Sequence, residues 1–273
     1  MCNLARVTQH IRGKLEAQGE EDLERRVLTL ISTRDNIDWV IDDRGNYWRT
    51  FQFIEGATTF DVVETVDQAR EVGHAFGEFQ SQLIDLGPPQ LAFTIPDFHN
   101  TRERLSAFQE AVERDVCNRA ASVRDEISRV DHYVDLVDNL LKLQLAGDIP
   151  LRVVHNDTKI NNVLIDDETG KGLCVIDLDT VMPGLVADDF GDLVRTSSSF
   201  AREDERNLSK VVVELPIFEA LVIGYLSASG SFLTDSEVDS LIVGSKLMTY
   251  CLLYTSDAAD DTPCVDLGGR RII

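Results

Sequence analysis

His155-Asn156-Asp157-Thr158-Lys159-Ile160-Asn161-Asn162, followed by Val175-Ile176-Asp177-Leu178-Asp179, is the part of this sequence that decides how the rest is interpreted. It places aspartates at positions 157 and 177 and an asparagine at position 162. Enzymatic phosphoryl transfer needs groups of these kinds: a carboxylate that accepts the proton of a hydroxyl group, and an amide and a carboxylate that hold Mg²⁺ on the phosphates. The spacing therefore predicts a phosphoryl-transfer site.

Each residue of this predicted site has a role that follows from its chemistry. Asp157 would orient the acceptor hydroxyl and accept its proton. Asn162 and Asp177 offer hard oxygen atoms, which Mg²⁺ prefers as ligands together with phosphate oxygens and water. Lys159 would place a positive charge on the phosphoryl group in transit, whereas His155 would support the loop rather than titrate in the reaction.

The local pattern around these residues predicts strands joined by a turn. The segment 152–154 is a short apolar strand, and the segments 162–166 and 173–177 are two further strands around a turn-forming run of acidic residues and glycines. Such a hairpin returns Asn162 and Asp177 to the same end, where one ion could bind both. The alternative is an ordinary surface hairpin preceded by a His-Asp loop, and the agreement of spacing, residue types and strand context favours the functional interpretation.

At these motifs the sequence resembles the aminoglycoside phosphotransferase and choline kinase superfamily, whose fold is like that of protein kinases. The stretches 157–162, 175–184 and 188–192 are most similar to the N-acetylhexosamine 1-kinase branch, and the similarity extends over about 3–250. The resemblance implies an α+β, protein-kinase-like bilobal fold with a truncated N-terminal lobe and a mostly helical C-terminal lobe. One departure is Asn156, where many relatives carry glycine, which adopts left-handed backbone geometry more easily.

The resemblance also implies the chemistry. Asp157 is the base, Asn162 and Asp177 hold Mg²⁺, ATP is the phosphoryl donor, and the acceptor is the anomeric hydroxyl of an N-acetylhexosamine. Other small alcohols remain as alternative acceptors: an aminoglycoside, choline or an amino-acid hydroxyl. A protein kinase is disfavoured because Met182-Pro183-Gly184 follows the metal motif without a long activation segment. A catalytically inert nucleotide-binding module is the non-enzymatic alternative.

Four further charged residues lie close to the predicted site. Asp189-Phe190-Gly191 matches the magnesium tripeptide of protein kinases but falls too far downstream, so Asp189, Asp192 and Arg195 are predicted at a helix start that braces the catalytic loop. A metal or substrate contact from these residues is the alternative. Asp179 would share a strand face with Asp177 at a period of two, where it assists the metal, contacts substrate or is simply solvated.

Composition excludes several other classes of protein. The chain has 273 residues, of which 43% are hydrophobic and 27% charged, and its net charge of −22 argues against a nucleic-acid partner. An acidic surface could favour a cationic substrate, but solvated acidic helices explain the charge equally well. The sequence has no apolar run long enough for a membrane span and no secretory signal, and its five cysteines lack metal spacing, so a cytoplasmic protein with reduced thiols is expected. The oligomeric state stays open.

The chain is predicted to consist of two lobes. Residues 1–56 are interpreted as the remnant of an N-terminal lobe, with an amphipathic helix, strands at 27–31, 39–41 and 47–54, and a hinge at 51–56. By resemblance, the peptide groups of the hinge residues Gln52, Phe53 and Ile54 would hydrogen-bond adenine. Residues 57–250 would form the catalytic C-terminal lobe, in which a helix at 66–86 and a buried Cys174 belong to the core; His99 and His132 receive no role.

Both ends of the sequence look incomplete. No glycine-rich phosphate-covering turn precedes the first helix, and residues 251–273 resemble a translated sequencing adapter rather than native protein. We therefore expect a partial chain whose C-terminal lobe is also truncated. Without the strands that cover the phosphates, ATP would lose contacts that align its γ-phosphate, and a misplacement of about 1 Å can lower the rate about a hundredfold. Negligible turnover is therefore expected from the 273-residue chain alone.

Overall fold

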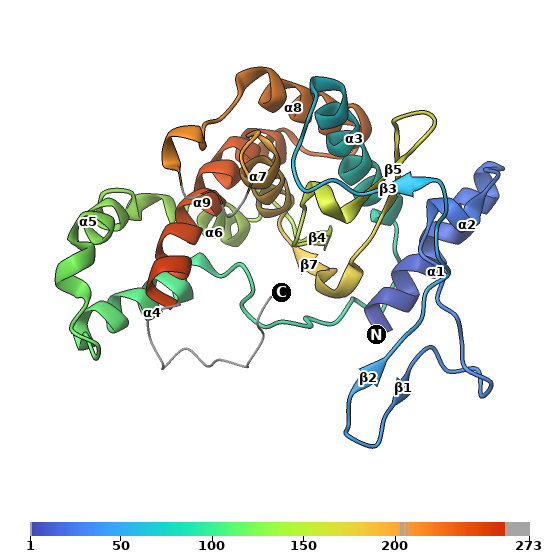
Figure 1. The fold of residues 1–273 in the computed structure, drawn as a ribbon, viewed down its shortest axis with the longest axis horizontal. Coiled ribbons are helices and arrows are strands. Elements are labelled where there is room, and N and C mark those ends of the chain that lie inside the picture. The colour runs from blue at the N-terminus through green and yellow to red at the C-terminus, as the bar shows by residue number, and fades with distance from the viewer. Residues whose placement is uncertain (1, 203–204, 206, 260–273) are drawn as a thin grey trace.

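The structure is a computed structural model that describes residues 2–202, 205 and 207–259 (Figure 1). The helices are α1 (Cys2–Gln18), α2 (Leu23–Arg26), α3 (Val66–Leu83), α4 (Thr101–Arg114), α5 (Arg124–His132), α6 (Asn139–Ala146), α7 (Val186–Ser197), α8 (Leu215–Ser229) and α9 (Asp235–Ala259). The strands are β1 (Val40–Ile41), β2 (Tyr47–Trp48), β3 (Ala57–Thr58), β4 (Arg152–Val154), β5 (Val163–Asp166), β6 (Gly172–Val175) and β7 (Met182–Gly184). Short strands and a larger helical part give the expected α+β class.

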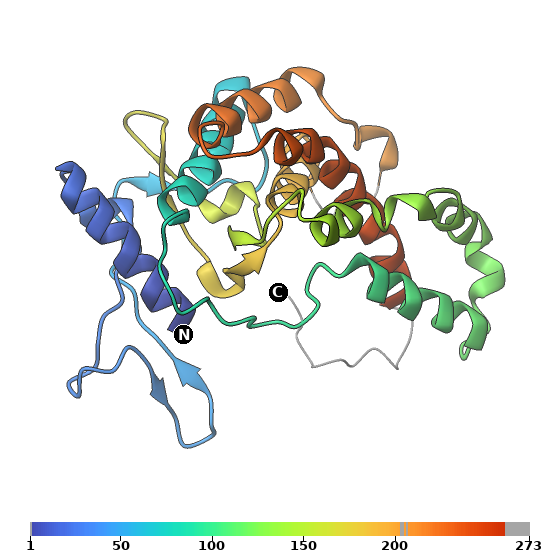
Figure 2. The same ribbon diagram turned by 180° about the vertical axis from the view of Figure 1, so that it is seen from behind.

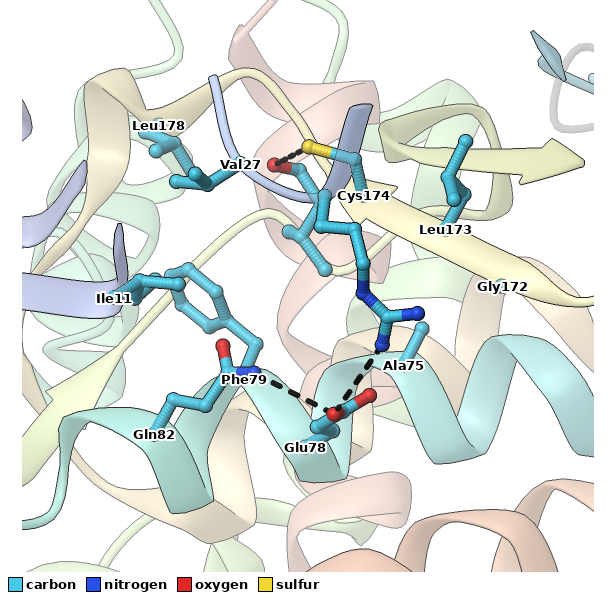
Figure 3. A pocket seen from close by; sticks show the side chains of 12 residues that line it. Ile11, Val27, Ala75, Glu78, Phe79, Gln82, Gly172, Leu173, Cys174 and Leu178 are labelled. Carbon is cyan, nitrogen blue, oxygen red and sulfur yellow. Dashed lines mark hydrogen bonds and ion pairs between the residues drawn. The ribbon is translucent and has the colours of Figure 1, made fainter. Parts of the chain in front are cut away.

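The first helix is amphipathic and its apolar face is buried. The buried side chains recur at helical spacing, and they pack against α3 and the segment after β6: Leu4, Val7, Ile11 and Leu15. Figure 3 shows Ile11 of α1, Phe79 of α3 and Cys174 of β6 around the small cavity that they line. Cys174 is buried, as predicted, and burial raises the pKa of its thiol to about 12. The predicted N-terminal helix is thus anchored to the helical part.

The strands predicted near the N-terminus are shorter than expected. Residues 27–31 do not form a strand in the structure; only Leu30 makes an isolated antiparallel bridge, to Phe51, and the predicted strand at 47–54 contracts to Tyr47–Trp48. A strand needs a hydrogen-bonding partner along its length, and the described part of the chain provides one only at that bridge. A turn joins β1 to β2, in which the Asp42 carboxylate accepts hydrogen bonds from the Arg44 and Asn46 N–H groups.

The helical part is held by two close helix pairs, α3 with α8 and α7 with α9 (Figure 2). Glycines allow the close approach: a Cβ on Gly244 of α9 would lie 1.9 Å from the Ala187 carbonyl oxygen of α7, and one on Gly224 of α8 would lie 2.0 Å from the Arg70 carbonyl oxygen of α3. The helix predicted for 66–86 begins at Val66, where the Thr65 side chain accepts a hydrogen bond from Gln68 N–H, and ends at Leu83. The lack of a side chain at Gly244 lets the backbone of α9 contact that of α7 directly, and this contact fixes the position of α7.

Two small antiparallel sheets present the predicted site. In one, β5 pairs with β6 as the predicted hairpin, with Val163 opposite Val175; in the other, β4 pairs with β7. The loop 155–162 connects β4 to β5, and the turn 176–181 connects β6 to β7. The chain therefore crosses twice between the same two sheets, and both crossings carry the residues singled out by the sequence.

The last described helix runs beyond the point where the native sequence was expected to stop. Helix α9 continues to Ala259, and Cys251 is buried against α4 and α6. The predicted adapter origin of residues 251–273 stays a prediction, and residues 260–273 lie outside the described part of the chain. Among the described helices, none combines the length and apolar character needed to cross a membrane.

Candidate active site

The loop after β4 brings three of the predicted residues into direct contact. The Asn162 Nδ2 donates hydrogen bonds to the Asp157 carbonyl oxygen at 2.8 Å and to its carboxylate oxygen Oδ2 at 3.2 Å. The Lys159 Nζ lies 3.2 Å from the other carboxylate oxygen of Asp157. Asn162 is buried, but Asp157 and Lys159 are partly exposed, so a substrate can reach the Asp157 carboxylate. This arrangement orients the Asp157 carboxylate and places a cation beside it.

Asp177 follows the end of β6 and is part of the same group of charges. Burial raises the pKa of Asp177, and the nearby carboxylates of Asp179 and Asp157 raise it further. Its carboxylate accepts no hydrogen bond from the residues that the structure describes. An unpaired carboxylate next to other acidic groups is the environment that a divalent cation would stabilise.

The donor set fits Mg²⁺. Because the amide nitrogen of Asn162 is turned toward Asp157, the amide oxygen is left to coordinate together with the Asp177 carboxylate. Within the described residues no group of three or more His, Cys, Asp or Glu side chains could hold a metal by itself. A carboxylate and an amide oxygen are ligands of the kind that Mg²⁺ takes, with phosphate oxygens and water completing its shell.

The prediction that Asp179 shares a strand face with Asp177 is wrong. Asp177 has a left-handed backbone with a φ of 57°, and a 3₁₀ turn, Leu178–Thr180, follows directly. The period-two alternation of a strand therefore does not apply. Asp179 instead accepts two hydrogen bonds from the Arg49 guanidinium, at 2.5 and 2.8 Å, which ties the segment before the hinge to this turn.

Asp189 lies in the first turn of α7 and supports the loop 155–162. Its carboxylate accepts hydrogen bonds from the backbone N–H groups of His155 at 2.8 Å and Asn156 at 2.6 Å. The Gln80 side chain of α3 donates a third hydrogen bond to it, at 2.7 Å. Because the Asp189 carboxylate already accepts these three hydrogen bonds, its geometry is that of a support for the loop and not of a metal ligand.

His155 and Asn156 complete the support of the loop. The His155 ring is buried between Phe76 and Phe79, and its Nε2 lies 2.9 Å from the Ile176 carbonyl oxygen. Asn156 has a φ of 67°, the left-handed conformation for which glycine is better suited, and its side chain donates to the Thr180 carbonyl oxygen at 2.9 Å. The side chain thereby gives a fixed contact that a glycine would lack.

Asp192 and Arg195 form a buried ion pair on α7. The Arg195 guanidinium donates to Asp192 Oδ1 at 2.8 and 3.0 Å. Burial raises the pKa of Asp192, and the positive charge of Arg195 opposes that rise. The second oxygen, Oδ2, is buried without a hydrogen-bond partner in the described part of the structure. The pair lies on the helix that supports the loop, and the charges of Asp157 and Lys159 also act on Asp192.

The predicted hinge lies apart from these residues. Gln52 N–H already donates to the Thr29 carbonyl oxygen at 2.9 Å, so it is not available to a nucleotide. Phe53 is 82% exposed and Ile54 is buried, and their peptide groups remain the candidates for an adenine contact. Among the described residues, no hydrogen bond or ion pair joins the hinge to the catalytic loop.

The structure adds residues that the sequence did not single out. Gln80 had a signal, because it is a polar residue on the buried stripe of an amphipathic helix, but Arg49 and Asp188 had none. His99, which received no role, lies with its Nε2 3.2 Å from the Asn156 carbonyl oxygen, so that nitrogen carries the proton. Burial is the main cause that lowers the pKa of His99 to about 4, which keeps the ring neutral.

Comparison with known proteins places this arrangement in a family. Among solved structures, the chain is similar to a microcompartment-associated aminopropanol kinase, with 18% identity, a TM-score of 0.52, and 93% of this chain and 74% of the other covered. It is also similar to spectinomycin phosphotransferase in complex with ADP and spectinomycin, with 14% identity, a TM-score of 0.53, and 93% and 73% covered. At these identities the likeness concerns the fold, and it confirms the expected kinase-like architecture.

The sequence match agrees with the structural one and extends over the whole site. The model of the family described as "Phosphotransferase enzyme family" matches residues 15–215, a range that includes the hinge, the loop 155–162 and helix α7. The chain therefore belongs to the phosphotransferase enzyme family.

Proposed function

We propose that this protein is an ATP- and Mg²⁺-dependent kinase that transfers a phosphoryl group to the anomeric hydroxyl of an N-acetylhexosamine. The observation that supports it most is the group formed by Asp157, Lys159 and Asn162, which lie within hydrogen-bond distance of one another beside the unpaired Asp177 carboxylate. The sugar acceptor is supported by the resemblance of the motifs 157–162, 175–184 and 188–192 to sugar 1-kinases.

The residues divide the work of the reaction. Asp157 would hold the acceptor hydroxyl and accept its proton, while the hydrogen bond from Asn162 keeps the carboxylate oriented. Lys159 would offset the negative charge of the phosphoryl group as it moves between oxygens. Asn162 and Asp177 would hold Mg²⁺, which when bound neutralises charge on the phosphates. The partner is then a small molecule, and we place the protein in the cytoplasm on its cysteine usage.

ADP release with a panel of acceptors tests the reaction and the acceptor together. The panel contains N-acetylglucosamine, N-acetylgalactosamine, an aminoglycoside, choline and an amino acid with a hydroxyl group, and it is run with the 273-residue chain and with any longer protein that contains it. We expect turnover to be selective for an N-acetylhexosamine, and to be negligible in the 273-residue chain by itself. Phosphorus NMR of the product would show the phosphate on the anomeric oxygen.

Other outcomes assign the activity differently. Turnover with another acceptor alone would keep the kinase and discard the sugar. Magnesium-independent turnover would contradict the metal site. Nucleotide binding without turnover in either protein would support an inert nucleotide-binding module.

A further inference from the structure

A cavity of about 540 Å³ opens beside the catalytic loop. The segment 93–103 and helix α6 form one wall, and β7 with the start of α7 forms the other. Asn156, the residue before the predicted base, lies in the wall, so a molecule in the cavity would be next to Asp157. The lining combines aliphatic and aromatic side chains, such as Phe93, Leu140 and Met182, with polar and charged ones, such as Asp97 and Glu103.

Asp188 is the buried acidic side chain of the cavity lining. It lies in the first turn of α7, is 7% exposed, and its small exposed part opens into the cavity. Its carboxyl group accepts no hydrogen bond from the described residues, whereas the neighbouring Asp189 accepts three. A buried polar group without a partner costs free energy, so a ligand that supplies hydrogen bonds would be bound favourably there.

Burial and a neighbouring cation together determine the charge of Asp188. The guanidinium group of Arg104 lies near Asp188 and over the Phe98 ring, donates to the Phe98 carbonyl oxygen, and makes no ion pair within the described residues. Burial, assisted by Asp189, raises the pKa of Asp188 to about 8, while the Arg104 charge opposes the rise. Near pH 7 the carboxyl group is then mostly protonated, and His99 in the same wall is neutral.

We infer that Asp188 is a specificity residue of the acceptor site, where its carboxyl group hydrogen-bonds the hydroxyl groups of an uncharged polyhydroxy acceptor held in this cavity. The inference rests on the proposed function and names the residue that selects the acceptor class. An uncharged sugar can both donate to and accept from a carboxylic acid, and its apolar ring face matches the aliphatic and aromatic walls. An ammonium group at this depth would instead meet a mostly neutral Asp188, since the charged acids of the lining, Asp97 and Glu103, lie at its exposed edge.

Binding of the acceptor without ATP tests this inference separately from turnover. Calorimetry would compare N-acetylglucosamine with choline on the wild-type chain and on the Asp188→Ala, Asp188→Asn and Asp235→Asn variants. Asp235 is a matched control, because it is an exposed aspartate in the first turn of α9. We expect Asp188→Ala to weaken sugar binding about tenfold or more. We expect Asp188→Asn to weaken it less than threefold, since an amide still donates and accepts, and Asp235→Asn to leave it unchanged.

A second variant covers the case in which Asp188→Ala does not fold. Leu141→Phe enlarges a side chain of the cavity wall without touching α7, so it should also weaken sugar binding while leaving ATP-induced stabilisation intact. Choline binding as tight as sugar binding, or unchanged sugar binding in both Asp188→Ala and Leu141→Phe, would overturn the inference. If the sugar is a substrate but Asp188→Ala leaves its KM unchanged, the inference fails and the proposed function stands. Absence of turnover with every acceptor in the wild type would instead refute the proposed function.

Discussion

The two layers of the site differ in how fully their polar groups are paired. The reaction centre, formed by Asp157, Asn162 and Asp177, is partly exposed, and the Asp177 carboxylate has no hydrogen bond in the described structure. The brace beneath it, formed by Asp189, Gln80 and Tyr225, is buried and continuously bonded: Tyr225 donates to Gln80 at 2.5 Å and Gln80 donates to Asp189. Incomplete pairing thus marks where ligands are expected, and complete pairing marks the support.

The contrast has an energetic consequence. Like charges held together without a ligand lower the stability of the folded state, and a buried network that satisfies its members raises it. Changes in the reaction centre should therefore mainly lower activity and leave stability nearly unchanged. Changes in the brace should mainly lower stability. Each variant below tests one side of this comparison.

Asp177→Asn should have the largest effect on activity. Removing a charge from the proposed metal site should lower kcat about 10²–10³-fold and raise the Mg²⁺ concentration needed for half-maximal rate. Its Tm at neutral pH should be unchanged or higher, because burial and the neighbouring carboxylates oppose the Asp177 charge, and asparagine tolerates the left-handed backbone. Rates across a magnesium titration and a thermal melt give both quantities. An unchanged magnesium dependence would separate Asp177 from the metal.

Asp189→Ala should have the largest effect on stability. It leaves the N–H groups of His155 and Asn156 and the Gln80 amide without their acceptor, which should lower the free energy of unfolding by about 2–3 kcal/mol. Urea denaturation measures it, with Asp235→Asn as the control on an exposed helix start. A wild-type midpoint in Asp189→Ala would mean that the brace does not hold the loop.

The pH dependence of stability should report on Asp188. Its folded pKa of about 8 lies above the ordinary value of 3.8, so the folded state binds more protons than the unfolded state between these values, and stability falls as the pH rises through that window. Asp188→Asn removes this dependence, so its Tm relative to the wild type should rise steadily from pH 5 to pH 8.5, by about 2–4 °C for each kcal/mol of stability that the wild type loses. Comparing the two proteins at each pH removes the pH dependence that does not involve Asp188. A constant difference would contradict the buried, mostly protonated carboxyl group.

Arg49→Ala should have the smallest effect on stability. The Arg49–Asp179 pair has good two-point geometry, but Asp179 is more than half exposed, and exposed ion pairs contribute about 0–1 kcal/mol. We expect a loss of less than about 1 kcal/mol that shrinks further in high salt. A loss of several kcal/mol would show that this pair, and not the packing of α1, joins the segment before the hinge to the site.

What the sequence predicted correctly depends on neighbouring residues. The hairpin 163–175 follows from alternation, turn residues and short spacing. What it missed depends on distant segments. Arg49 reaches Asp179 across 130 positions, and the left-handed Asp177 that ends the strand alternation is not encoded by any local pattern. The cavity at Asp188 combines five separate parts of the chain, which no spacing in the sequence brings together.

The rate of ADP formation by Asp157→Asn, measured together with its Tm, tests most directly that the reaction centre is catalytic. In whichever form of the protein turns over an N-acetylhexosamine, the substitution should lower kcat about 10²–10⁴-fold, the usual contribution of a general base, and leave Tm within about 2 °C of the wild type. Wild-type kcat in Asp157→Asn would contradict the assignment of this residue as the base and, with it, the central claim about the site.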